Sequence, residues 1–283
     1  MTYQDYKIYF KKEVSKSYTD SESSILFEIF IQHLTNLNEI ELRKAMTKKM
    51  EESHSLQLQN IITQLKTGKP YQQILGETEF YGLKFFVDEH VLIPRPETEE
   101  LLELAISQIK TLGLLNKNFK ILDIGTGSGI IPIVLKKHFP NAEVTAIDYS
   151  VNALKTAKRN SDFHQVEINF IHQDYLNSDL TEVYDIIISN PPYIGTDEEE
   201  EIADSVKEFE PKMALFSPTS NALIFYEKIA GDCKNYLVEN GLVFLEINQK
   251  LGKETLELFI NTLSNVELLL DISGNDRFVW GIK

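Results

Sequence analysis

From residue 121 to its end, the sequence alternates short apolar segments, rich in β-branched residues, with longer segments whose apolar residues recur at helical spacing. A strand that reads as a nearly continuous apolar run has both faces buried, which happens when helices cover both sides of a sheet. The alternation therefore predicts an α/β fold, in which a mainly parallel sheet lies between two layers of helices.

Seven segments are expected to form the strands of this sheet. They are residues 120–125, 143–148, 168–173, 184–189, 241–247, 266–272 and 277–283. Helices are expected to begin near Gly129, Ser150, Asn221 and Gly252. A turn sequence, Ser-Gly-Asn-Asp, precedes the last segment, so the final two strands are expected to pair antiparallel.

The chain before this alternation has a different character. Apolar residues at helical spacing predict a small helical domain over residues 1–70. Residues 71–96 are rich in aromatic and β-branched residues around Gly82, which predicts a β-hairpin linker before the α/β domain of residues 97–283. Charge supports this division, because residues 1–70 carry a net charge of +1 and the remainder carries −16.

Charge and composition narrow the class of protein. The 283 residues include 28 Lys and Arg against 43 Asp and Glu, a net charge of −15, which is the wrong sign for holding a nucleic-acid backbone. No apolar run approaches the roughly 18 residues of a membrane span, and the N-terminus has no recognisable secretory signal. Cys233 is the single cysteine, so an internal disulfide or a multi-cysteine metal site is excluded. These features predict a cytoplasmic protein, with a monomer as the default.

A glycine-rich loop follows the first strand of the α/β region. Gly125, Thr126, Gly127, Ser128 and Gly129 lie between that strand and the next helix, at the edge of the sheet where open α/β folds bind ligands. Glycine lets backbone N–H groups approach a ligand closely and tolerates positive φ. The same pattern also suits a tight strand-to-helix turn, and it lacks the later third glycine of the dinucleotide fingerprint.

Residues at the ends of the next two strands favour a nucleoside ligand. Asp148, 23 residues after Gly125, is placed to accept hydrogen bonds from both hydroxyls of a ribose, although it could instead cap the helix at Ser150. Asp174 and Tyr175 follow the third strand, where a carboxylate could accept from the adenine amino group and a ring could pack on the base. A plain turn at the strand end is the alternative there. With the glycine loop, these residues indicate a cofactor that contains adenosine.

The most specific motif is Asn190-Pro191-Pro192-Tyr193, which ends the fourth strand. Two prolines fix the backbone and remove two donors, so carbonyl groups are left to accept hydrogen bonds. The Asn190 side-chain oxygen and the Pro191 carbonyl can together accept both hydrogens of a planar –NH2 group, and Tyr193 offers a ring face for stacking. A rigid turn is the alternative interpretation.

These motifs, in this order, resemble the class I S-adenosylmethionine-dependent methyltransferases that act on planar amino groups, whose sheet is seven-stranded and Rossmann-like. Longer segments resemble the HemK/PrmC family, the release factor glutamine methyltransferases. The segments are GKPYQQILGETEFYG, LIPRPETEELLE, ILDIGTGSGIIPI, SNPPYI, YEKIAG and SGNDRFVWG, and they extend from Gly68 to the C-terminus.

The resemblance implies transfer of a methyl group from S-adenosyl-L-methionine to the side-chain amide nitrogen (N5) of the glutamine in the Gly-Gly-Gln motif of class 1 peptide chain release factors. It implies that Gly125–Gly129, Asp148 and Tyr175 hold the cofactor, that Asn190–Tyr193 hold the glutamine, and that Asn190 contacts both. The family often has Trp where this chain has Tyr175, which leaves the packing of that ring open. Because acceptors on both N–H bonds would activate a weakly nucleophilic amide, no metal ion is expected. Residues 1–70 would recognise the protein substrate.

Two other functions compete with this one. Amino-methyltransferases of adenine or guanine in nucleic acid use a similar Asn/Asp-Pro-Pro-Tyr/Phe motif on a flipped base, but the acidic α/β region disfavours them. A binding or scaffold protein that keeps the cofactor fold would not need Asn190.

Two further segments have open roles. The Pro94–Thr98 segment could line the site or be a rigid linker, and the acidic run Asp197–Glu201 could meet a basic partner or stay solvated.

Overall fold

A computed structural model describes residues 1–115, 117–195 and 204–283 of the chain. The chain divides into two compact units, which are Met1–Glu77 with Asp204–Phe209 and Thr78–Ala203 with Glu210–Lys283. The helical unit thus extends to Glu77, beyond the boundary expected at residue 70, and includes a segment from far along the sequence. The acidic run Asp197–Glu201 lies outside the described residues. Within the described part, no helix is long and apolar enough to cross a membrane.

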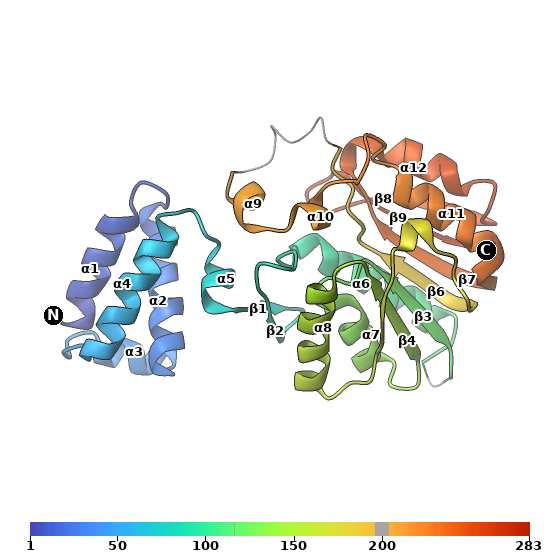
Figure 1. The fold of residues 1–283 in the computed structure, drawn as a ribbon. Helices are drawn as coiled ribbons and strands as arrows, with labels where there is room; N and C mark the ends of the chain where they lie inside the picture. Colours follow the sequence, from blue (N-terminus) through green and yellow to red (C-terminus); the bar gives the residue numbers. More distant parts are fainter. Residues whose placement is uncertain (116, 196–203) are drawn as a thin grey trace. The chain divides into compact units, whose positions relative to one another are not determined.

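The first unit is all-helical (Figure 1). Its helices are α1 (Tyr3–Val14), α2 (Asp20–Thr35), α3 (Glu39–Ala45), α4 (Glu52–Leu65), α5 (Tyr71–Leu75) and α9 (Asp204–Phe209). Thr2, Thr19 and Asn38 each begin a helix with a capping box, a pair of reciprocal hydrogen bonds that satisfies N–H groups of the first turn. Phe10 and Phe27, both fully buried, lie edge to face with ring centroids 5.8 Å apart. The unit therefore has a hydrophobic core of its own.

A two-stranded hairpin precedes the α/β sheet, within the region 71–96 where one was expected. Its strands are β1 (Glu77–Phe80) and β2 (Leu83–Phe86), and they form a sheet of their own. Tyr81 and Gly82 join them with positive φ angles of 54° and 66°, as in the two-residue turns whose twist matches that of paired strands. The N–H of Tyr81 donates to a carboxylate oxygen of Glu99 (2.7 Å), which ties the hairpin to the following helix.

The second unit contains the seven-stranded sheet predicted from the sequence. Its strands are β3 (Lys120–Ile124), β4 (Glu143–Asp148), β5 (Asn169–His172), β6 (Tyr184–Ser189), β7 (Leu237–Glu246), β8 (Asn265–Leu270) and β9 (Asp276–Ile282), in the spatial order β5-β4-β3-β6-β7-β9-β8. The first five are parallel. The expected antiparallel pairing of β8 with β9 is confirmed, and β9 also pairs antiparallel with β7, which no sequence pattern indicated.

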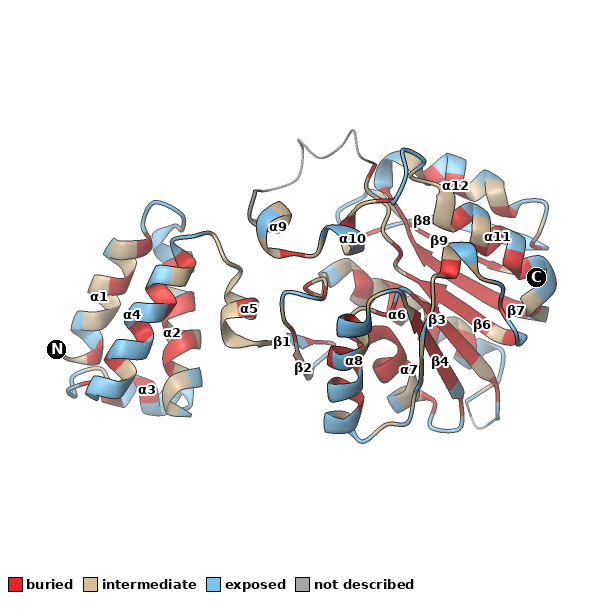
Figure 2. Cartoon of the chain, in the orientation of Figure 1, coloured by how far each residue is buried: buried red, intermediate tan, exposed pale blue. Residues whose placement is uncertain are grey.

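Helices lie on both faces of this sheet (Figure 1). The described helices of the unit are α6 (Pro96–Thr111), α7 (Ile130–His138), α8 (Val151–His164), α10 (Lys212–Leu215), α11 (Ile224–Tyr236) and α12 (Gly252–Phe259), together with the short 3-10 turns η1 (Tyr175–Asn177) and η3 (Gln249–Leu251). Alternate residues of β6 serve the two layers. Ile186 and Ile188 pack with α6 and α7, whereas Ile187 packs with α11 and α12. The central strands are buried (Figure 2), which accounts for their continuous apolar sequences.

The register of the parallel strands aligns the residues expected to form a site. Asp148 ends β4, Gly125 and Asn190 directly follow β3 and β6, and Glu246 ends β7. The residues immediately before these four are paired across the sheet, so all four lie side by side at the carboxyl edge. The strand order reverses between β3 and β6, and open α/β sheets bind ligands at such a switch point.

A buried asparagine joins the hairpin to the glycine loop. Asn160, on α8, is fully buried. Its Oδ1 accepts from the N–H of Phe86 (2.7 Å), and its Nδ2 donates to the carbonyls of Phe86 and Ser128 (both 2.9 Å). One side chain thus holds β2 and the loop against the same helix.

Replacing Asn160 with alanine is expected to lower the free energy of unfolding by about 3 kcal/mol, because three partly or fully buried backbone groups lose a hydrogen-bond partner. Trp280, the single tryptophan, lies in the α/β unit and reports its unfolding in urea. Asn152→Ala, at an exposed position of the same helix, is the matched control and should change the free energy of unfolding by less than about 0.5 kcal/mol. Equal stability of the two variants would contradict a structural role for Asn160.

Candidate active site

A cavity of about 410 Å³ lies at the carboxyl edge of the sheet. Most residues singled out from the sequence line it, namely Gly125, Thr126, Gly127, Ser128, Asp148, Asp174, Tyr175, Asn190 and Pro192. Gly129, Pro191 and Tyr193 lie next to lining residues but do not line it themselves. The fold therefore brings the glycine loop, the ends of β4 and β5, and the Asn-Pro-Pro-Tyr motif to one cavity.

The glycine loop is held by backbone hydrogen bonds and by Asp148. Gly125, Gly127 and Gly129 have φ angles of 75°, 54° and 81°, which glycine alone adopts without strain. The N–H of Gly125 donates to the Ile147 carbonyl (2.9 Å), and the N–H of Gly127 donates to Oδ2 of Asp148 (2.8 Å). The loop is thus shaped before any ligand binds.

The loop also packs closely against its neighbours. A Cβ atom added at Gly125 would lie 4.0 Å from the carbonyl oxygen of Asn190 and from Cα of Pro191. One added at Gly129 would approach the Cβ atom of Ala157, on α8, to 3.0 Å, which is too close for ordinary packing. The loop therefore lies directly between α8 and the Asn-Pro-Pro-Tyr motif.

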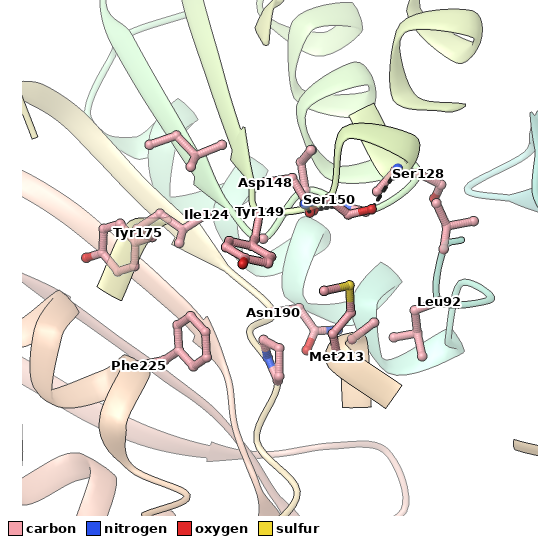
Figure 3. A pocket seen from close by; sticks show the side chains of 18 of the residues that line it. Leu92, Ile124, Ser128, Asp148, Tyr149, Ser150, Tyr175, Asn190, Met213 and Phe225 are labelled. Carbon is pink, nitrogen blue, oxygen red and sulfur yellow. Dashed lines mark hydrogen bonds between the residues drawn. The ribbon is translucent and has the colours of Figure 1, made fainter. Parts of the chain in front are cut away.

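Asp148 uses both carboxylate oxygens on backbone groups. Besides the bond from Gly127, Oδ1 accepts from the N–H of Ser150 (2.8 Å). Ser150 itself caps α8, through a bond from the N–H of Ala153 to its hydroxyl oxygen (3.2 Å). Burial raises the pKa of Asp148, and the backbone hydrogen bonds oppose that shift. Asp148 lines the cavity beside Ser150 (Figure 3), and each oxygen keeps a lone pair for a ligand hydroxyl.

Two aromatic rings flank this part of the cavity. Tyr175 is buried, and its hydroxyl donates to a carboxylate oxygen of Asp232 (2.8 Å), so its ring rather than its hydroxyl is turned to the cavity. Tyr149, directly after Asp148, is 60% exposed and also lines the cavity (Figure 3). No sequence motif singled it out. Asp174 lines the same wall.

Among the described residues, the side-chain amide of Asn190 has one hydrogen-bond partner. Its Nδ2 donates to Oγ1 of Thr98 (3.2 Å), and the Thr98 hydroxyl donates to Oε2 of Glu246 (2.7 Å). The hydroxyl of Tyr193 donates to Oε1 of Glu246 (3.3 Å). Oδ1 of Asn190 is therefore the end of the amide that remains for a ligand.

Glu246 is the buried centre of this group, with 1% of its surface exposed. Burial raises the pKa of Glu246 to about 7, against the hydrogen bond from Thr98 and the positive charge of Arg277. Tyr193 packs its ring on the hydrophobic core beneath α11 and directs its hydroxyl to Glu246. Asn190 and Pro192 are thus the members of the motif that meet the cavity.

Comparison with known proteins identifies the family. Residues 9–76 match the PrmC N-terminal domain family, and residues 104–209 match the Methyltransferase small domain family. A release factor glutamine methyltransferase from Flavobacterium psychrophilum is 43% identical over 281 residues, which are 99% of this chain and 98% of the relative. The chain belongs to the release factor glutamine methyltransferase family.

Other comparisons agree with this membership. A release factor glutamine methyltransferase from Lactococcus lactis is 38% identical over 262 residues, covering 92% of this chain and 94% of the relative. A solved methyltransferase structure from Pyrococcus furiosus has a TM-score of 0.51 at 16% identity and covers 82% of this chain and 99% of that one, which supports the fold alone. The resemblance to the HemK/PrmC family and the methyltransferase fold are both confirmed.

Part of the methyltransferase cavity comes from residues that no motif indicated. Met213, Phe216 and Phe225 give it apolar walls. Their sequence context carries no signal, because apolar residues in loops and short helices are common. The Pro94–Thr98 segment, in contrast, was indicated by its sequence. Its Pro94, Arg95 and Thr98 line the cavity, so this segment is part of the site and not a linker alone.

Segments distant in sequence are tied together on this side of the cavity. The carboxylate of Glu210 is buried and accepts from the N–H of Ile93 (2.9 Å) and from Nη2 of Arg95 (2.7 Å). Ile194 and Phe216 form a parallel bridge. These bonds hold the region of α10 against the segments before α6 and after β6.

A buried carboxyl group lies under the glycine loop of this methyltransferase. Asp123, on β3, is fully buried, and neither of its oxygens has a hydrogen-bond partner among the described residues. Burial raises the pKa of Asp123 to about 7, and the nearby Thr126 hydroxyl opposes the shift only in part. The Thr126 hydroxyl, at the cavity wall, also lacks a partner within the described part of the chain.

Asp123→Asn is expected to flatten the pH dependence of stability. The native carboxyl keeps its proton up to about pH 7, whereas an unfolded one releases it near pH 4. The parent therefore loses stability as pH rises through this range, and the variant loses less because only the contribution of Asp123 is removed. The free energy of unfolding of the variant, relative to that of the parent, should therefore increase by on the order of 2 kcal/mol between about pH 4 and about pH 8. Urea unfolding followed by Trp280 fluorescence measures it. Because Glu246 titrates in both proteins, equal pH slopes would contradict a buried, protonated Asp123.

Proposed function

We propose that this chain transfers a methyl group from S-adenosyl-L-methionine to the side-chain amide nitrogen of the glutamine in the Gly-Gly-Gln motif of class 1 peptide chain release factors. Relatives at 38–43% identity over nearly the whole chain are release factor glutamine methyltransferases. The observation that carries the assignment is the amide oxygen of Asn190, which has no hydrogen-bond partner within the described part of the chain and lies in a cavity that the glycine loop also lines. A cofactor and an amide substrate could meet between them.

S-adenosyl-L-methionine fits the donors and acceptors of the cavity. The carboxylate of Asp148 would hold the ribose hydroxyls, while Asp174, Tyr175 and Tyr149 would surround the adenine. The hydroxyl of Thr126, which has no hydrogen-bond partner among the residues that the structure describes, suits the polar amino-acid end. When bound, the cofactor supplies a methyl group on a positively charged sulfur.

The chain's own residues would orient and activate the substrate amide. Oδ1 of Asn190 and the Pro191 carbonyl can accept both N–H bonds of an amide, and no hydrogen bond to the Pro191 carbonyl is found within the described residues. Two acceptors stabilise the positive charge that develops on the nitrogen as it gains a fourth bond. Holding the amide in the cavity next to the methyl donor would lower the entropic part of the activation barrier. The methylated amide is strongly acidic, so its proton can leave without a dedicated base.

The helical unit is proposed to recognise the protein part of the substrate. It matches the PrmC N-terminal domain family over residues 9–76. Its near-zero net charge contrasts with that of the acidic remainder. We further propose a cytoplasmic monomer, in keeping with a single buried cysteine, Cys233.

Asp148→Asn is expected to weaken S-adenosyl-L-methionine binding by roughly 10-fold or more, because an amide cannot accept at both ends from Gly127, Ser150 and ribose. Isothermal titration calorimetry measures the dissociation constant. Asp162→Asn, at an exposed position of α8, is the matched control. Unchanged affinity in Asp148→Asn would show that this carboxylate does not hold the cofactor.

Asn190→Ala is expected to lower turnover by about 100-fold or more, with less than about 3-fold change in cofactor affinity, because an acceptor used in the transition state is lost. Transfer of a labelled methyl group to a purified release factor measures turnover, and peptide mass locates the label. Asn169→Ala, exposed on β5, serves as the control. Equal turnover of Asn190→Ala and the parent would remove the two-acceptor mechanism.

The same assay separates the competing functions. The release factor, the factor with its motif glutamine replaced, and bulk nucleic acid are offered in parallel. Label on the intact factor alone supports the proposed function. Label on nucleic acid would instead identify an amino-methyltransferase of adenine or guanine. No label despite measurable cofactor binding would favour another protein substrate or a binding role.

A further inference from the structure

We propose that Thr98 and Glu246 are positioning residues that orient the side-chain amide of Asn190, so that its oxygen and not its nitrogen meets the substrate. The inference rests on the proposed function, because only an amide oxygen in this place can accept from a substrate –NH2 group. Asn190 would touch the substrate, whereas the other two residues would act through it.

The direction of the hydrogen bonds follows from the chemistry of each group. An ionised carboxylate only accepts, so the single hydrogen of the Thr98 hydroxyl is donated to Oε2 of Glu246 (2.7 Å). The Thr98 oxygen can then only accept on its other side. The atom of Asn190 at 3.2 Å must therefore be the donor Nδ2, and Oδ1 points away from Thr98.

Without Thr98 the two ends of the amide would be nearly interchangeable, because the oxygen and the NH2 group are similar in size. Turned the other way, Asn190 would present N–H donors to the N–H groups of the substrate. Such an arrangement leaves the developing charge without its acceptor. The hydroxyl of Thr98 thus decides between a productive and an unproductive orientation.

The three residues hold fixed places in the fold. Thr98 lies in the first turn of α6 and Glu246 at the end of β7, each with 1% of its surface exposed. β7 pairs with β6 up to the residue before Asn190. Water is excluded from Glu246 and Thr98, so it does not compete for these hydrogen bonds. Burying a carboxylate costs free energy, and a conformational role is a reason to retain one.

Glu246 is surrounded by groups on several elements. Arg277 on β9 favours its ionised form, and Glu97 on α6 disfavours it. Tyr193 donates to its side chain, and Tyr226 on α11 donates to its backbone carbonyl (3.1 Å). Burial dominates and raises the pKa of Glu246 to about 7. A protonated Glu246 would donate to Thr98, which would free the Thr98 hydrogen for Oδ1 of Asn190 and reverse the amide.

The first test compares two substitutions at Thr98. Thr98→Val keeps the shape and removes the hydroxyl, and it is expected to lower kcat about 10-fold or more with cofactor affinity within about 2-fold of the parent. Thr98→Ser keeps the hydroxyl and should recover most of kcat. Thr255→Val, which removes an equally buried hydroxyl without a hydrogen-bond partner among the described residues, should leave kcat unchanged. The melting temperature of each variant separates unfolding from loss of orientation.

The second test follows the titration of Glu246. In the parent, kcat should rise with pH through about 7, as the carboxylate becomes an acceptor only. Glu246→Gln cannot titrate but can still accept from Thr98, so this part of the pH profile should disappear. The Asn190 side-chain amide, observed by nuclear magnetic resonance with 15N-labelled asparagine and assigned by its absence in Asn190→Ala, should show the same midpoint in the parent and none in Glu246→Gln.

The outcomes distinguish this inference from the proposed function. If the parent does not label a release factor, the proposed function fails, while the Asn190 spectrum still decides the orientation. If the parent is active, then unchanged kcat in Thr98→Val overturns the positioning role. An equal loss in Thr98→Val and Thr98→Ser also overturns it, as does an Asn190 resonance that titrates identically in Glu246→Gln.

Discussion

The candidate site depends on the parallel pairing of four neighbouring strands. β4, β3, β6 and β7 end at one edge of the sheet, so Asp148, Gly125, Asn190 and Glu246 meet there although they come from distant parts of the sequence. Because the side-chain period of a strand is two, a slip of one residue would exchange the two faces of a strand. The side chains on both faces are closely packed against other buried residues, and a slip would disrupt this packing. The packing that stabilises the sheet is therefore also what places the glycine loop beside the Asn-Pro-Pro-Tyr motif.

This edge carries carboxyl groups that are costly to bury. Asp123 and Glu246 are almost completely inaccessible, and burial raises both pKa values to about 7. Asp148 is different, because backbone N–H groups of Gly127 and Ser150 occupy its oxygens. The same low dielectric that penalises these charges strengthens each directed hydrogen bond they make. The large apolar layers above and below the sheet offset this cost, and the edge can then hold polar groups in fixed orientations.

Residues that directly follow a strand could be predicted from the sequence. The apolar pattern locates the strands, and parallel topology brings Gly125, Asp148 and Asn190 to one edge. Side-chain partners could not be predicted in this way, because Thr98 and Glu246 lie 92 and 53 residues from the groups they help to hold, Asn190 and Tyr193. The part of the helical unit beyond residue 70 gives a weaker sequence signal. α5 is only five residues long, and α9 joins the unit from a distant part of the chain, so neither gives a periodic signal that spans several turns.

A single carboxylate links the two ends of the Asn-Pro-Pro-Tyr motif. Glu246 holds Tyr193 directly and Asn190 through Thr98, while two prolines restrict the backbone between them. In the proposed reaction, the substrate amide would meet two acceptors, Oδ1 of Asn190 and the Pro191 carbonyl. The first is already held in its orientation, which favours the stabilisation of developing charge. The substrate amide has two N–H bonds and satisfies both acceptors, whereas the methylated product has one and leaves an acceptor unpaired. Because an unpaired buried acceptor costs free energy, the same geometry that favours methyl transfer also weakens the hold on the product.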